Sequence, residues 1–226
     1  ECDWSSDVCS SDLKYTIDKM GVDVFKSEVE KRCGFKFEDA RPFEFKERQD
    51  HFGWRMNHEG KWYYTVFVEC GRITDTDNAT LKSALYEISD TGKANFRFTG
   101  NQNLILSEIL EQDKSEIESI LIKHRVIDLN EKSSPIRKNS MACVAFNTCP
   151  LALAEAQRYL PSLITKIEPI LFKHGLDKDQ IIIRITGCPN GCGRPTLAEI
   201  GLIGTAYGKY NLHLGGDRLE IGRAHV

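Results

Sequence analysis

The 226-residue sequence predicts an α+β fold made of two successive structural units. Three observations lead to this prediction. Strand-like and helix-like segments follow one another in the order β-α-β-β-α between residues 61 and 124. A polar stretch containing Pro135 separates this part from a second series of helices and strands. That second series holds four cysteines in two closely spaced pairs, a pattern typical of a metal or cluster site.

The first expected element is a helix over residues 17–33. Apolar residues recur there at helical spacing, and Gly34 follows as the usual C-terminal stop. A charged and aromatic segment with Pro42 then acts as a connector. Residues 61–70 are rich in aromatic and β-branched side chains, which favour a strand.

Four further segments complete the first unit. They are a helix over residues 81–92, strands at 95–99 and 104–106, and a helix over 117–124. Asp113 and Glu116 have the spacing of a capping box for the last helix. The resulting order is typical of a ferredoxin-like α+β unit.

The second unit is expected to begin after residue 130, inside the polar stretch. Pro150 should open a helix that Pro161 stops, because proline suits the first helical position and cannot continue a helix. The remaining elements are a helix ending at Lys173 and strands at 181–185, 202–203 and 210–214. The strand at 181–185 leads directly into the second cysteine pair.

The two ends of the chain are interpreted as translated DNA that is not part of the natural gene. Residues 7–13 can be written in permitted codons as GAC GTG TGC TCT TCC GAT CT, and the reverse complement of that string encodes residues 221–226. We therefore assign residues 1–13 and 220–226 to a sequencing adaptor and expect them to join no compact core. The natural segment is then 14–219.

Removing these ends changes the composition. Acidic residues fall from 33 to 28 and basic residues from 30 to 29, so the net charge changes from −3 to about +1. A near-neutral chain gives no argument for nucleic acid or a charged membrane surface as a partner. No apolar run approaches the roughly 18 residues of a membrane span. The six remaining cysteines, four of them in two clusters, favour a reducing, cytoplasmic location.

The four clustered cysteines have a specific spacing. Cys143 and Cys149 are separated by five residues, Cys188 and Cys192 by three, and 38 residues lie between the two pairs. Four thiolates are what a [4Fe–4S] cluster requires, one for each iron. Gly187, Gly191 and Gly193 surround the second pair and allow backbone N–H groups to approach a cluster closely.

Other fates of these cysteines stay open. A structural zinc site with four cysteines is one, although zinc modules usually place their paired thiolates two to four residues apart. A non-catalytic iron–sulfur electron carrier is another. Cys33 and Cys70 stand outside the two pairs, and we expect both to be buried and chemically inert.

Four stretches resemble the sulfite and nitrite reductase hemoprotein family. They are residues 96–103 (FRFTGNQN), 139–156 (NSMACVAFNTCPLALAEA), 184–194 (RITGCPNGCGR) and 210–216 (YNLHLGG). The resemblance covers residues 14–219, and its second and fourth stretches favour the bacterial, NADPH-linked branch of sulfite reductases. A ferredoxin-dependent nitrite or sulfite reductase is the alternative within the family.

This resemblance implies a domain order and a set of ligands. Residues 14–130 would be a linker helix with a ferredoxin-like (parachute) half-domain, and residues 131–219 an incomplete α/β domain that binds siroheme and a [4Fe–4S] cluster. The cluster ligands would be Cys143, Cys149, Cys188 and Cys192. Cys192 would also bridge to the siroheme iron as its axial ligand.

The resemblance also implies the chemistry. The enzyme would reduce sulfite to sulfide in sulfate assimilation and cysteine biosynthesis, with electrons from an NADPH-linked flavoprotein or from ferredoxin. Asn101, Gln102 and Arg194 are candidate siroheme contacts. No catalytic residue is assigned, because the cationic residues that hold sulfite belong to the family's N-terminal half. The 226-residue chain alone is therefore expected to be inactive.

Overall fold

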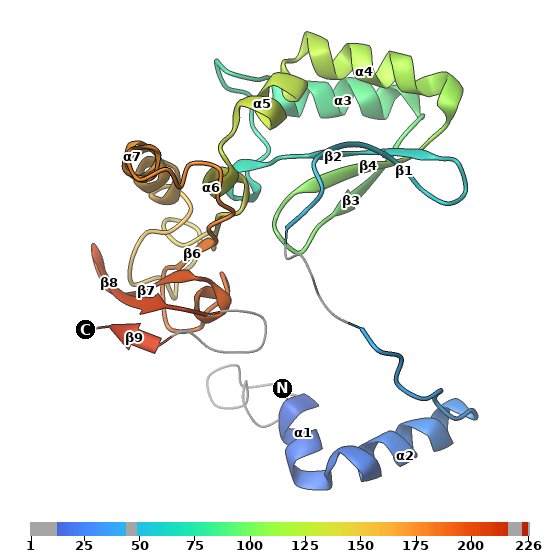
Figure 1. Cartoon of the computed structure of the whole chain (residues 1–226), viewed down its shortest axis with the longest axis vertical. Helices are drawn as coiled ribbons and strands as arrows, with labels where there is room; N and C mark the ends of the chain where they lie inside the picture. The colour runs from blue at the N-terminus through green and yellow to red at the C-terminus, as the bar shows by residue number, and fades with distance from the viewer. Residues whose placement is uncertain (1–12, 44–48, 217–222, 226) are drawn as a thin grey trace. The chain divides into compact units, whose positions relative to one another are not determined.

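A computed structural model of the chain describes residues 13–43, 49–216 and 223–225. The chain divides into two compact units, residues 1–47 and residues 48–226. In the first unit, α1 (Leu13–Met20) and α2 (Val22–Cys33) replace the single helix predicted from residue 17 to 33 (Figure 1). Gly21 separates them because its φ of 80° is left-handed and not helical. As predicted, α2 ends at Gly34.

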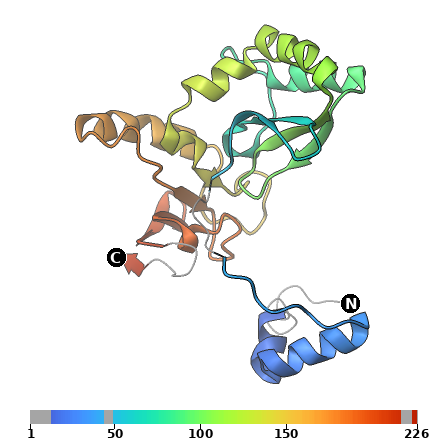
Figure 2. The ribbon, with the colours of Figure 1, turned by 45° about the vertical axis from the view of Figure 1, so that its right-hand side comes forward.

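The second unit begins with a four-stranded antiparallel sheet of order β1-β2-β4-β3. Its strands are β1 (Gly53–Met56), β2 (Trp62–Val66), β3 (Asn95–Phe98) and β4 (Leu104–Ile109). Helices α3 (Leu81–Thr91) and α4 (Lys114–Lys123) cover one face (Figures 1 and 2). The predicted order β-α-β-β-α is confirmed, and β1 is an additional edge strand that the sequence pattern did not predict.

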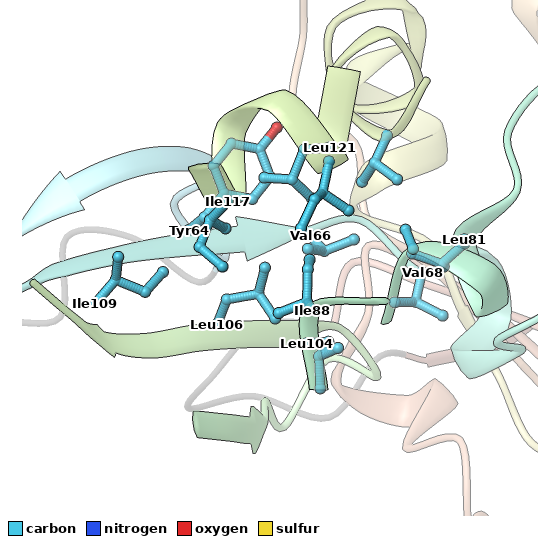
Figure 3. Close-up of a cluster of buried hydrophobic side chains, with 13 residues drawn as sticks. Tyr64, Val66, Val68, Leu81, Ile88, Leu104, Leu106, Ile109, Ile117 and Leu121 are labelled. Carbon is cyan, nitrogen blue, oxygen red and sulfur yellow. The ribbon is translucent and has the colours of Figure 1, made fainter. Parts of the chain in front are cut away.

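The core of this first sheet lies between β2, β4 and the two helices (Figure 3). Tyr64 and Val66 of β2 and Leu106 of β4 point to this side, each at most 2% exposed. Ile88 of α3 and Leu121 of α4 meet them from the helices and are fully buried. Each such side chain contributes about 1.5–3 kcal/mol of burial free energy.

The predicted capping box of α4 is wrong. Asp113 has helical angles (φ −96°, ψ −13°) and makes no side-chain cap hydrogen bond. An N-cap residue needs an extended conformation, and the preceding 3-10 turn η2 (Glu111–Asp113) has already turned the chain. The Asp113 and Glu116 carboxylates instead bind Lys93 Nζ, at 3.2 and 2.6 Å.

The polar stretch after α4 is helical rather than a loose connector. It forms α5 (Val126–Lys132) and α6 (Pro135–Lys138). The buried Asn130 of α5 accepts the Phe67 N–H and donates to the Thr65 carbonyl, both at 2.8 Å, which attaches α5 to the end of β2. The predicted domain boundary after residue 130 stays a prediction, since residues 48–226 form one compact unit.

The second sheet has five strands in the order β5-β6-β7-β8-β9. The strands are β5 (Met141–Ala142), β6 (Ile183–Thr186), β7 (Ile200–Ala206), β8 (Lys209–Leu214) and β9 (Arg223–His225). β5, β6 and β7 are parallel, and β8 and β9 follow in antiparallel pairs. The three predicted strands of this unit are confirmed as β6, β7 and β8.

The predicted helix between Pro150 and Pro161 is wrong. Residues 150–159 form turns and irregular chain, and α7 (Leu160–Lys173) begins where the helix was expected to stop. Pro161 lies in the first turn of α7, where the missing N–H needs no intrahelical acceptor. The predicted end of the helix at Lys173 is confirmed, and α7 continues through Pro169.

Part of the expected terminal artefact takes part in the fold. β9 pairs with β8, so the expectation that residues 220–226 join no core is wrong for Arg223–His225. The physical reason is that an open strand edge accepts any extended backbone, whatever its side chains. α1 likewise includes Leu13. Residues 1–12, 220–222 and 226 lie outside the described part of the chain, so their adaptor origin stays a prediction.

Candidate functional site

The two cysteine pairs lie at the same edge of the second sheet. β5 and β6 are adjacent and parallel. Cys143 directly follows β5, and Cys188 follows β6 after a single residue, Gly187. Because the carboxyl ends of neighbouring parallel strands meet at one edge, the two cysteine loops begin side by side. Loops on opposite faces of the sheet, which would contradict the ligand assignment, are not observed.

Hydrogen bonds tie the two loops together. The Cys143 N–H donates to the Ile185 carbonyl at 3.1 Å, and the Gly187 N–H donates to Cys143 Sγ at 3.2 Å. In return, the Gly187 carbonyl accepts the N–H groups of Leu153 and Ala154 at 2.8 and 2.9 Å. Gly187 therefore holds both the first cysteine and the chain that follows Cys149. Hydrogen bonds to ligand sulfur are one of the factors that set the reduction potential of an iron–sulfur cluster.

Glycine is required where these loops approach other backbone. A Cβ at Gly187 would lie 2.6 Å from the Ala154 carbonyl oxygen, and one at Gly193 would lie 2.5 Å from the Ile185 oxygen. Real Cβ contacts are not this short, so any larger residue would displace the loops. Gly191 has a φ of 70°, which L-residues rarely adopt. The three glycines that the sequence singled out thus shape the loops.

The four thiols interact electrostatically. Burial raises the pKa of Cys192, and the neighbouring Cys143, Cys188 and Cys149 raise this pKa further. Cys188 is buried, Cys143 and Cys149 are half-buried, and Cys192 is exposed. A thiol with a raised pKa, such as Cys192, keeps its proton until a metal replaces it, so metal binding at this thiol would release a proton.

The four thiols form a soft donor set. Within the described ranges, no three Cys, His, Asp or Glu side chains converge closely enough to hold one metal ion. A [4Fe–4S] cluster spreads its four thiolate ligands over four irons. Zinc instead gathers four ligands around one centre with Zn–S bonds of about 2.3 Å. Soft thiolates also select iron–sulfur clusters over hard metal ions.

The three candidate siroheme contacts lie next to the cysteine loops and bind protein groups. Gln102 Nε2 donates to the Ala142 carbonyl at 2.7 Å. Arg194 donates to the Gly100 carbonyl. Asn101 Nδ2 donates to Asp50 Oδ1 at 3.3 Å. Their predicted roles toward a cofactor stay predictions.

The two cysteines outside the pairs differ from each other. Cys33 is exposed at the end of α2, so the prediction that it is buried is wrong. Cys70 is 6% exposed, and burial raises its pKa to about 12, as expected of an inert thiol. It lies in the short 3-10 turn η1 (Glu69–Gly71), and it belongs to the hydrophobic cluster against which Cys143 packs.

The sequence patterns missed two features beside the site. Asp50 accepts hydrogen bonds from Thr99 Oγ1 at 2.6 Å and Asn103 Nδ2 at 2.8 Å, although it lies 49 residues before Thr99. No local spacing could reveal such a partner. The loops of the first cysteine pair also expose apolar side chains, namely Val144, Leu151 and Leu153.

Comparisons with known proteins agree with this architecture. A sequence model described as the nitrite/sulfite reductase ferredoxin-like half domain matches residues 55–124, which run from β1 to the end of α4. The sulfite reductase [NADPH] hemoprotein beta-component of Leptospira biflexa serovar Patoc is 63% identical over 207 residues, covering 92% of this chain. The corresponding protein of Vibrio vulnificus is 54% identical over 219 residues, covering 96% of this chain.

Among solved structures, the NirA protein of Mycobacterium tuberculosis superposes with a TM-score of 0.72 at 25% sequence identity. The superposition covers 95% of this chain and 41% of the NirA chain. The chain spans only 37% and 38% of the two curated relatives. These matches confirm the predicted α+β fold with a ferredoxin-like half-domain.

Proposed function

Since the chain belongs to the nitrite and sulfite reductase hemoprotein family, we propose that it is part of a sulfite reductase hemoprotein that reduces sulfite to sulfide. The observation that carries this proposal is the pairing of the two cysteine loops at one edge of parallel strands, joined through Gly187 and Cys143. The similarity to hemoprotein beta-components over more than nine-tenths of the chain supports it.

Four thiolates would hold the redox centre. Cys143, Cys149, Cys188 and Cys192 would bind a [4Fe–4S] cluster, and Cys192 would also hold siroheme. The exposure of Cys192 supports its double role, because its sulfur must face a second group outside the loop. When bound, the two cofactors supply the one-electron transfers from which the six-electron reduction is built.

The chain's own residues would support this centre. The Gly187 N–H and the Thr186 hydroxyl both lie within hydrogen-bonding distance of Cys143 Sγ, at 3.2 and 3.5 Å, and would stabilise its thiolate. Val144, Leu151 and Leu153 would cover apolar cofactor surface and exclude water from it. No residue of this chain is proposed to hold sulfite.

The similarity to the same family supports a proposal for the electron donor. The two named relatives are NADPH enzymes, so an NADPH-linked flavoprotein is the proposed electron donor, with ferredoxin as the alternative. None of the helices in the described ranges combines the length and apolar character that crossing a bilayer requires. A cytoplasmic location is part of the proposal.

The test uses the full-length protein purified without oxygen. We expect siroheme absorption bands, about four irons and four sulfides per cluster, and sulfide production from sulfite with a reduced viologen dye as donor. A colourless protein that contains zinc would support a structural zinc module. Iron–sulfur absorption without haem bands would indicate an electron carrier. Faster turnover of nitrite than of sulfite would favour the nitrite reductase alternative.

A further inference from the structure

The Gln102 side chain binds the backbone directly before the first cysteine. Its Nε2 donates to the Ala142 carbonyl at 2.7 Å, and its Oε1 accepts the Ala142 N–H at 3.3 Å. Ala142 belongs to β5, the edge strand of the second sheet. The side-chain amide of Gln102 therefore makes the two hydrogen bonds with Ala142 of β5 that a neighbouring strand would make.

This pairing fixes the peptide group that joins Ala142 to Cys143. Its carbonyl is held by Gln102 on one side, and its N–H donates to the Ile185 carbonyl of β6 at 3.1 Å on the other. A peptide group is planar, so holding both ends fixes its orientation. This fixes the position of the Cys143 Cα, from which the side chain with its sulfur extends.

The turn that carries Gln102 is itself held in place. Thr99 Oγ1 accepts the N–H groups of Asn101 and Asn103 at 3.2 and 3.1 Å, and Thr99 donates to Asp50 at 2.6 Å. Asn103 is 1% exposed, and its Oδ1 accepts the Val68 N–H at 3.0 Å. Residues 99–103 are thus attached to the first sheet, and they also contact the second sheet.

The same turn contacts the loop of the last cysteine. Arg194, two residues after Cys192, donates to the Gly100 carbonyl, and its guanidinium lies 3.7 Å from the sulfur of Met141 in β5. One turn of the ferredoxin-like sheet therefore reaches the chain just before Cys143 and the chain just after Cys192.

We propose that residues 99–103 are a positioning element for the redox centre, in which Gln102 sets the place of Cys143 by holding the Ala142–Cys143 peptide group. In this role Gln102 acts on Cys143 through the backbone. The inference rests on the proposed function only in naming a [4Fe–4S] cluster as the group that Cys143 holds.

The experiment compares Gln102→Met with Gln157→Met in the full-length protein. Methionine keeps the length of the side chain and removes its hydrogen bonds. Gln157 is the matched control, because its Nε2 also donates to a backbone carbonyl, that of Cys70, at 2.9 Å. Cys70 does not belong to a strand that leads into one of the two cysteine pairs. The first readout is the rate of iron release to a chelator. We expect Gln102→Met to accelerate it roughly 10–100-fold, the usual cost of losing support behind a ligand.

The control should change iron release less than about twofold, because Gln157 holds the Cys70 carbonyl and not the strand that leads into Cys143. This difference is expected even if both variants lose similar thermal stability. The electron paramagnetic resonance spectrum of the reduced cluster should shift in Gln102→Met only. Equal iron release in the two variants, or wild-type iron release in Gln102→Met, would overturn the proposal.

A second readout needs no cofactor. In the metal-free protein, hydrogen exchange of the Ala142 amide should accelerate at least about tenfold in Gln102→Met, because its acceptor is lost, and should be unchanged in Gln157→Met. An unchanged Ala142 amide would refute the positioning role. If the wild-type protein binds no iron, the proposed function fails, and the exchange measurement still decides whether Gln102 holds this strand.

Discussion

The core of the first sheet and the cysteine edge of the second sheet are held together in different ways. In the first sheet, large apolar side chains such as Val66, Leu106 and Ile88 are completely buried between strands and helices. At the cysteine edge of the second sheet, backbone packs against backbone. A Cβ at Gly187 or Gly193 would lie 2.6 or 2.5 Å from a carbonyl oxygen.

This difference separates stability from function within one unit. The first sheet obtains its stability from side-chain volume and needs no ligand to complete its core. The cysteine edge brings four interacting thiols together and depends on glycines and backbone hydrogen bonds for its shape. Changes in side-chain volume should therefore damage the first sheet, whereas an added Cβ or a lost sulfur should damage the site.

The largest effect is expected at Cys192. Cys192→Ser in the full-length protein should abolish sulfide production, because under the proposed assignment Cys192 would hold both the cluster and siroheme. Cys70→Ser is the control, since it changes a buried thiol outside the two pairs. The assay is sulfide production without oxygen, with a reduced dye as donor. Near-normal turnover in Cys192→Ser would show that the bridging assignment is wrong.

The largest loss of stability is expected in the first sheet. Leu106 is fully buried, and Leu106→Ala should lower the free energy of unfolding by about 2–5 kcal/mol, through lost burial and a residual cavity. Denaturant unfolding measures this change. The fraction that remains folded should keep its full iron content. Iron loss in proportion to the lost stability would mean that iron binding at the cysteine edge depends on the packing of the first sheet.

The same difference explains how far the sequence could predict the structure. The elements β2, α3, β3, β4 and α4 were predictable, because the burial pattern of a sheet and its covering helices is visible in the spacing of apolar residues. The capping box at Asp113 failed, since spacing alone cannot show that the residue already has helical angles. β1 is only four residues long and carried too little pattern to be recognised.

The cysteine loops were predictable from the sequence, their cofactor stays a prediction, and the residues that support the loops were not predictable. The spacing of the four cysteines indicated a cluster, and the glycines around Cys188 indicated close backbone approach. The helix predicted after Pro150 is absent because Leu153 and Ala154 donate to Gly187, a partner more than thirty residues away. The role of Asp50 depends on contacts of the same long range. Such partners are fixed by tertiary structure and leave no local signal.

A smaller effect is expected from adding one Cβ at the cysteine edge. Gly193→Ala should destabilise the protein by about 1–3 kcal/mol, the usual range for overpacking, because the new Cβ meets the Ile185 oxygen. Gly100→Ala is the matched control, since a Cβ there has no neighbour within 4 Å. Both changes are measured by denaturant unfolding of the metal-free protein. Equal stability of the two variants would contradict backbone packing as the determinant of this edge.

The smallest expected effect is the contribution of Cys70 to the pH dependence of the free energy of unfolding. Burial, with a smaller contribution from the nearby Glu69, raises the pKa of this thiol from about 9 to about 12, while Arg137 and Arg72 lower it in part. The folded state therefore binds the proton more tightly than the unfolded state. The resulting stability is complete below about pH 9 and is lost as the pH rises toward 12, so about 1 kcal/mol should be lost between pH 8 and pH 10.

Many lysines and tyrosines titrate in the same range, and only the difference between wild type and Cys70→Ala isolates this thiol. The free energy of unfolding of wild type should fall more steeply with pH than that of Cys70→Ala. Parallel curves for the two proteins would mean that Cys70 is not shielded from water as its 6% exposure indicates.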